Sequence, residues 1–188
     1  MRAALLAPVV LASLFAFPAQ AQVIDTASNR LELLGDAPAA CVIATPTAGN
    51  GSNASFTSTG ATSARINITQ LVDGTNASSL ASSIELNVPV ICNSAHRVVV
   101  RSTNGGLARL GGNQRGSGPF AEFLAYSFGI GWAGQQVDRG SDTGEVVLDA
   151  TQPAKGEVRL RIATPAGSGP LVAGQYNDAI VIEFQAAN

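Results

Sequence analysis

Residue types that build catalytic and metal sites are scarce in this sequence. The 188-residue chain has one histidine, His96, and two cysteines, and only 13% of its residues are charged. Zinc sites usually need several histidine or cysteine ligands. A Ser–His–Asp triad would have to use His96, and the sequence has no Gly-x-Ser-x-Gly elbow to carry the serine. The sequence therefore predicts neither an enzyme nor a cofactor or metal site, and His96 is expected to be a polar residue at the start of a strand.

Positive charge is also scarce. The formal net charge is −2 and Lys155 is the only lysine, whereas binding to nucleic acid requires a basic patch. Nucleic acid is therefore not an expected partner. The polar residues are mostly Ser, Thr, Asn, Gln and Gly, which gives a nearly uncharged surface. Such a surface suits packing against copies of the same chain, and it is also typical of secreted β-proteins in general.

Long apolar runs are confined to the N-terminus. Arg2 precedes an apolar stretch from Ala3 to Phe17, and Ala19-Gln20-Ala21 matches an A-x-A cleavage signature. The stretch is short for a membrane span, and no later segment is a candidate for a transmembrane segment. We interpret residues 1–21 as a cleaved signal peptide. The mature chain is then expected to be exported from the cytoplasm.

Helical periodicity is nearly absent after the signal, and alternation with a period of two takes its place. The clearest case runs from Ser83 to Cys92, where every second residue is apolar. Seven further segments alternate or have a short apolar centre: Cys41–Ile43, Arg65–Val72, Arg97–Arg101, Leu124–Phe128, Val146–Leu148, Glu157–Ile162 and Ile180–Phe184. Many short strands with polar, Gly-rich connections predict an all-β sandwich or barrel.

Three local features refine this prediction. Pro89 lacks a backbone donor, so its strand is expected at a sheet edge or at a bulge. The segment Thr45–Thr62 is rich in Gly, Ser, Thr and Asn and is expected to be a loop or a weak edge strand. No linker or internal repeat divides the chain, so residues 41–188 are expected to form one domain.

Cys41 and Cys92 are the only cysteines. An even number of cysteines in an exported protein indicates a disulfide. The predicted bond joins the first core strand to the strand that ends at Cys92. The loop that it closes is long, so chain-entropy arguments give a stabilisation of about 4 kcal/mol.

Two motifs resemble ligand sites when each is taken alone. Gly129–Gly134 matches Gly-x-Gly-x-x-Gly, but a dinucleotide site also needs a helix after the glycines. The residues that follow are turn-like, so we interpret the glycines as a flexible turn around Trp132. Asp138, Asp142 and Glu145 offer oxygen ligands of the kind that calcium prefers. Their spacing does not match an EF-hand loop, and a solvated acidic turn is expected instead.

The order of several short motifs resembles that of a known family. The motifs are Cys41 soon after an exported N-terminus, the strand ending in Val90-Ile91-Cys92, the Arg97–Arg101 strand with Gly105-Gly106, Leu124-Ala125-Tyr126 with Trp132, and Gly174-Gln175-Tyr176-Asn177-Asp178. In this order they resemble the spore coat protein U domain family, which includes archaic chaperone–usher pilins. The resemblance covers most of the mature chain.

The resemblance implies an incomplete immunoglobulin-like sandwich that lacks its final strand. A periplasmic chaperone would lend a strand during folding. An outer-membrane usher would then exchange it for the N-terminal extension of the next pilus subunit, which is another subunit or a copy of this chain. The implied function is that of a structural subunit of a surface pilus that contributes to adhesion and biofilm formation. Alternation in the last strand gives Ile180, Ile182 and Phe184 as its core face.

Residues 22–40 are the candidate donor strand under this interpretation. Alternation in the extension is clean only over Leu31–Ala37, with Glu32 on the outer face. Leu31 and Leu33 would point into the neighbour's groove, with Gly35 and Ala37 on the same face.

Two other functions remain open from the sequence. Leu31–Leu34 could instead form the first strand of a self-complete secreted sandwich that binds carbohydrate or another surface component. Trp132 is the candidate exposed aromatic for that binding. An extracellular hydrolase would have to rest on carboxylates that the sequence does not pair.

Overall fold

The computed structural model describes residues 32–113 and 119–186, and these residues form β-strands and no α-helix. The chain divides into residues 1–36 and a compact unit of residues 37–188. In the first unit only Glu32–Asp36 are described, and they are exposed and belong to no strand. Within the described residues there is no helix long and apolar enough to cross a membrane. The predicted all-β class is confirmed.

The larger sheet is antiparallel and contributes one layer of the domain. Its strands, in spatial order, are β1 (Cys41–Ile43), β5 (Ser82–Cys92), β12 (Ala154–Thr164), β9 (Ser127–Trp132) and β10 (Gln135–Gly140). A further strand, β2 (Thr47–Ser52), also pairs with β5, beyond the end of β1. The longest ladder joins β5 to β12 over their full lengths.

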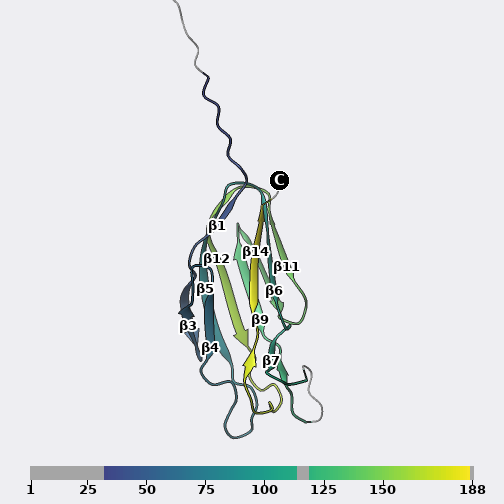
Figure 1. Cartoon of the computed structure of the whole chain (residues 1–188). Helices are drawn as coiled ribbons and strands as arrows, with labels where there is room; N and C mark the ends of the chain where they lie inside the picture. Colours follow the sequence, from purple (N-terminus) through teal and green to yellow (C-terminus); the bar gives the residue numbers. More distant parts are fainter. Residues whose placement is uncertain (1–31, 114–118, 187–188) are drawn as a thin grey trace, which may run out of the picture. The chain divides into compact units, whose positions relative to one another are not determined.

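The second layer is a three-stranded antiparallel sheet. Its order is β11 (Val146–Ala150), β6 (His96–Ser102) and β14 (Ile180–Ala186), so β14 is an edge strand. In Figure 1, β14 is the yellow strand that runs beside β6. The remaining strands form a small sheet and a hairpin: β13 (Tyr176–Asn177), β7 (Leu107–Arg109) and β8 (Phe123–Leu124), and β3 (Ala54–Ser58) with β4 (Ala64–Ile68).

The core lies between the two sheets, as alternation in their strands requires. Each long strand directs every second side chain into this core, which contains Ile84, Leu86, Val88, Val90, Val98, Val100, Phe128, Ile130, Val146, Leu148, Val158 and Leu160. Burying a side chain of this kind contributes about 1.5–3 kcal/mol. The apolar stripes of the sequence therefore specify which face of each strand is inside.

Pro89 was expected at an edge or at a bulge. The strand β5 is an inner strand of the larger sheet, but the ladder beside Pro89 is irregular, because residues 44–46 lie opposite only two residues of β5. Pro89 lies opposite Glu157 of β12, and its carbonyl accepts a hydrogen bond from Ala44 N at 2.9 Å. In a strand, the N–H and C=O of one residue point the same way. The missing donor of Pro89 therefore faces the segment between β1 and β2, where the ladder is already interrupted.

Of the turn expected around Trp132, only the part after the tryptophan is present. Gly129 and Gly131 lie within β9, and Trp132 pairs with Gln135 across a two-residue hairpin loop. That loop consists of Ala133 and Gly134, with φ values of 49° and 78°, as a type I′ turn requires. A Cβ on Gly129 would come within 2.2 Å of a carboxylate oxygen of the exposed Asp138, so a larger residue here would displace that side chain.

The predicted disulfide is confirmed. Cys41 of β1 and Cys92 of β5 are directly opposite each other, with their Cα atoms 4.1 Å apart and their sulfurs bonded. Asn93, just after β5, donates to the Pro38 carbonyl at 2.9 Å and accepts from Ala40 N at 2.7 Å. The bond and these contacts hold the short strand β1 against β5.

Removal of the disulfide is expected to destabilise the domain. The bond closes a loop of 51 residues, so the double substitution Cys41→Ala/Cys92→Ala should lower the free energy of unfolding by about 4 kcal/mol. Urea denaturation of the exported protein measures this change. Alkylation without reduction should modify no cysteine, and two reactive thiols in the wild-type protein would contradict the assignment.

Candidate functional site

The candidate site is an apolar groove of about 760 Å³ that runs along β14. Its sides are formed by residues of β1, β4, β7 and β14, and its floor by the inner face of β5 and β12. The apolar side chains that line it are Ile43, Ile66, Ile68, Leu86, Val88, Leu107, Leu160, Ile162, Ile180, Ile182 and Phe184. Polar and small residues complete the lining: Pro46, Thr59, Thr62, Ala64, Arg65, Tyr126, Asp178 and Ala179.

The floor of the groove belongs to the domain core. Leu86 and Val88 come from β5, and Leu160 and Ile162 from β12. Leu86, Val88 and Leu160 are buried there, whereas Ile162 is only partly buried. Within the described residues the second sheet ends at β14, and the groove lies beside that edge. The site is therefore bordered mainly by strands rather than by loops.

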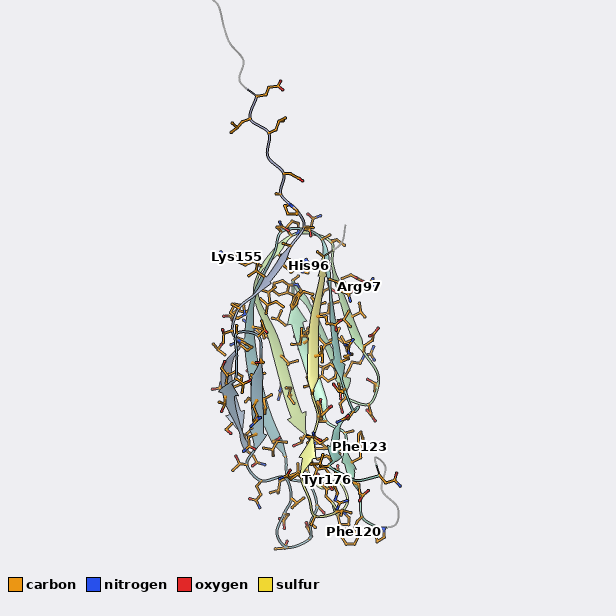
Figure 2. All side chains as sticks on the ribbon, viewed as in Figure 1. His96, Arg97, Phe120, Phe123, Lys155 and Tyr176 are labelled. Atoms are coloured by element: carbon orange, nitrogen blue, oxygen red, sulfur yellow. A yellow bond between two sulfur atoms is a disulfide. The ribbon has the colours of Figure 1, made fainter. Side chains whose placement is uncertain are left out.

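One side of the groove is β14, whose side chains have an unusual burial pattern. Ile180, Ile182 and Phe184 pack against the core cluster but are only partly buried. The expected core face of the last strand therefore contacts the core and also lines the groove. Figure 2 labels His96 and Tyr176, which lie near the two ends of this strand.

The backbone of β14 has a free edge along the groove. Thr103 N donates to the Ala179 carbonyl at 2.8 Å, and the register between β6 and β14 continues without a shift. Residues of an antiparallel strand alternate between those directed at the partner strand and those directed away. The N–H and C=O groups of Ile180, Ile182 and Phe184 therefore point away from β6. Within the described residues, no strand pairs with that edge.

A carboxylate fixes the start of β14. Asp178 accepts hydrogen bonds from the Tyr126 hydroxyl at 2.7 Å, from Asn104 N at 2.9 Å and from the Ser102 hydroxyl. Ser102 lies opposite Ile180 at the end of β6. The network joins β6 and β14 at the end of the groove and leaves the carboxylate fully occupied.

An aromatic cluster fixes the other end of β14. The ring of Phe184 meets that of Trp132 edge-on, with centroids 6.0 Å apart. Trp132 Nε1 donates to His96 Nε2 at 2.7 Å, so His96 carries its proton on Nδ1 and donates to the Ser94 carbonyl at 2.9 Å. His96 does begin β6, as expected, but it is 2% exposed and belongs to the core.

The structure changes the interpretation of several predicted site residues. Trp132 is 4% exposed, so it is not the exposed aromatic on which carbohydrate binding would depend. Leu33 and Leu34 are 93% and 91% exposed and belong to no strand, so the first strand of a self-complete domain is not formed there. Gly35 and Ala37 are exposed as well, and Leu31 lies outside the described residues.

The side chains that come close enough to bind a metal ion together already bond other groups. Among the described residues, the cluster that brings three suitable side chains together is Cys41, Cys92 and His96, within 4.8 Å of one another. The two sulfurs are bonded to each other and both nitrogens of His96 are hydrogen-bonded. Asp138 lies in β10, and Asp142 and Glu145 lie in the connection to β11, exposed to solvent.

Two parts of the groove were not recognised from the sequence. The alternation of Ile66 and Ile68 predicted a strand, but nothing in it showed that this strand lines a groove. Asp178 was noted only as part of a motif. A buried tyrosine that needs a hydrogen-bond acceptor, together with a carboxylate directly before the last strand, is the signal that could have connected Tyr126 with Asp178.

Comparison of the chain with protein-family models, with curated proteins and with solved structures finds no match. The function must therefore be inferred from the groove and from the segments that can reach it.

Tyr126 gives a test of the Asp178 network. Burial and the hydrogen bond to Asp178 raise the pKa of Tyr126 above its usual value of 10.0. The folded state thus favours the neutral phenol, and this contribution is complete below pH 10 and lost as the pH rises above 10. Tyr126→Phe should cost about 1–2 kcal/mol at pH 8 by urea denaturation.

The same variant should lose less stability than the wild type between pH 9 and pH 11, because it has no phenol to ionise at this site. Tyr176→Phe is the matched control, since Tyr176 is less buried and bonds only backbone carbonyls. Tyr176→Phe should lose nearly as much stability as the wild type between pH 9 and pH 11. Equal pH dependence in the wild type and Tyr126→Phe would contradict the assigned role.

Proposed function

We propose that this protein is a structural subunit of a chaperone–usher surface pilus that contributes to adhesion and biofilm formation. The groove accepts the N-terminal extension, residues 22–40, of the next subunit. A signal peptide, residues 1–21, directs the chain to the periplasm, from which it reaches the cell surface. Residues 41–188 are the pilin-like domain. The protein needs no cofactor and catalyses no reaction.

The free edge of β14 beside an apolar groove is the observation that carries this proposal. An added strand would complete the backbone hydrogen bonds of Ile180, Ile182 and Phe184 and cover their half-buried side chains. When a peptide binds by strand addition, main-chain hydrogen bonds give affinity and alternate side chains give specificity. An edge that is long, apolar and unpaired is also prone to aggregation, which a periplasmic chaperone would prevent by lending a strand.

The extension has the length and pattern that the groove requires. The strand β14 has seven residues, and Leu31–Ala37 is a segment of the same length. Leu33 is almost fully exposed in its own chain, so it is available for a neighbour. Burying Leu31 and Leu33 would contribute about 1.5–3 kcal/mol each. The usher and the following subunit, either another pilin or a copy of this chain, are the implied assembly partners.

A self-complete sandwich that binds carbohydrate is a weaker proposal. The one tryptophan is buried, with its indole N–H bonded to His96. The exposed aromatic that this function would need is therefore not supplied by Trp132.

Substitutions at the leucines of the N-terminal extension test the proposal. Leu31→Asp/Leu33→Asp should abolish fibres, because each charge would have to enter an apolar groove without a partner. Leu34→Asp is the matched control, since Leu34 has the opposite parity and should face outward. Each variant is co-expressed with the cognate periplasmic chaperone. Electron microscopy then detects fibres, and purification of the chaperone complex detects folded subunit, so a defect in assembly is distinguished from a defect in folding.

The double variant should form a soluble complex with the chaperone and no fibres, whereas Leu34→Asp should form both. Normal fibres from the double variant would exclude this segment as the donor. Degradation of the double variant even with the chaperone present would place the leucines in the subunit's own core and support a self-complete domain.

A further inference from the structure

Two asparagines of this chain are followed by glycine, Asn50 and Asn104. A glycine after an asparagine has chemical consequences, because it has no Cβ to keep its backbone nitrogen away from the side-chain carbonyl carbon of the asparagine. That nitrogen can attack the side-chain amide and close a five-membered ring. Both sites have the sequence that permits this reaction, so a difference in their reactivity must come from the fold.

Asn50 lies at a β-bulge. The pairs on either side of the bulge are Ala48–Leu86 and Gly51–Ile84. Two residues of β2, Gly49 and Asn50, therefore lie opposite one residue of β5, and this extra residue interrupts the ladder locally. All six residues of β2 are exposed. The bulge is thus open to water and is less constrained than a regular strand.

The side chain of Asn50 is free to turn toward the next residue. In the part of the chain that the structure describes, it makes no hydrogen bond. Other asparagines are held in place: Asn53 bonds three backbone groups, and Asn93 bonds two. Neither of these is followed by glycine. Asn50 therefore combines the reactive sequence with an unrestrained amide.

The backbone nitrogen that would attack is that of Gly51, and the ladder with β5 does not use it. The Pro89 carbonyl accepts a hydrogen bond from Ala44 N, so the odd-numbered residues of β5 direct their backbone groups toward β1 and β2. Gly51 lies opposite Ile84, an even-numbered residue. Opposite residues of an antiparallel pair point their backbone groups either toward each other or both away. The N–H of Gly51 therefore points away from β5.

Asn104 is restrained, although the same residue follows it. Its Nδ2 donates to the Asn177 carbonyl at 3.2 Å, and its backbone N donates to Asp178 at 2.9 Å. Gly105 has a φ of 78°, and its carbonyl accepts from the Ser141 hydroxyl at 2.8 Å. The ring could close only if the Asn104 amide broke its bond and the turn at Gly105 rearranged. The fold thus holds these groups away from the geometry of attack.

We propose that Asn50 is a site of spontaneous deamidation and that the fold protects Asn104 from the same reaction. The Gly51 nitrogen bonds to Cγ of Asn50, the bond from Cγ to Nδ2 breaks, and ammonia leaves with the proton of the Gly51 N–H. Water then opens the cyclic imide. Breaking the imide bond to Cγ gives aspartate, and breaking the bond to the main-chain carbonyl carbon gives isoaspartate. Water is the other reactant, and nothing is oxidised or reduced.

Either product places a carboxylate on the exposed strand β2, where the chain has a neutral amide. Isoaspartate also adds one methylene to the main chain, at a point where the bulge already interrupts the ladder. The domain is therefore expected to stay folded after the reaction. No residue of β2 lines the groove, so this proposal does not rest on the proposed function.

The test follows both sites while the folded protein is incubated at pH 8. Peptide mass spectrometry measures the fraction of each asparagine that has become an acid. Asn50 should react about tenfold faster than Asn104 or more, because displacement from the geometry of attack costs factors of this size. In concentrated urea, where the fold no longer restrains Asn104, the two rates should be similar.

Equal rates in the folded protein, or a faster reaction at Asn104, would overturn the proposal. It would also be overturned if Asn50 stayed intact in the folded protein over a period in which it reacts in urea.

The variant Gly51→Ala tests the assigned chemistry. A Cβ on Gly51 would meet its nearest neighbours at 3.4 Å or more, which are ordinary contact distances, so the variant should fold. Its methyl group should slow the reaction at Asn50 several-fold and leave Asn104 unchanged. An unchanged rate at Asn50 would mean that water hydrolyses the amide directly, which contradicts attack by Gly51. Asn50→Gln is the matched control, and it should give no acid at this position on the same timescale, because its longer side chain cannot close the five-membered ring.

Discussion

The free edge of β14 is the constraint on which the rest of this structure depends. The strand closes one side of a β-sandwich, yet among the strands that the structure describes it pairs with β6 alone, and its core-facing side chains are half covered. Leaving backbone donors and acceptors without partners is costly wherever water is excluded. The groove floor is apolar, so an occupant that supplies both backbone bonds and apolar side chains suits it better than water does.

The surrounding contacts hold this edge in a fixed position. Asp178 ties the start of β14 to β6 and to Tyr126, and Phe184 near its end packs against Trp132 and, through it, His96. The Cys41–Cys92 bond holds β1 in the larger sheet beside the same end. Binding a strand to a preorganised edge avoids the entropy that ordering the edge would cost.

The sequence predicted the class of fold and the inside face of each long strand, because alternation is a local signal that burial preserves. It did not predict the neighbours of each strand. Pro89 was expected at an edge or at a bulge, and it lies in an inner strand at the point where the ladder is interrupted between β1 and β2. Gly129 was interpreted as part of a turn, although it lies in a strand where Asp138 packs against it. Pairing order and the groove are long-range properties that no local pattern contains.

The most direct measurement is a high-resolution cryo-electron microscopy structure of the assembled wild-type protein. The account predicts density for Leu31–Ala37 of one copy in the groove of the next, bonded to the backbone of Ile182. The leucine side chains should point toward the floor formed by Leu86 and Leu160. An assembly in which the groove is empty, or in which copies contact each other only through other surfaces, would contradict the central claim.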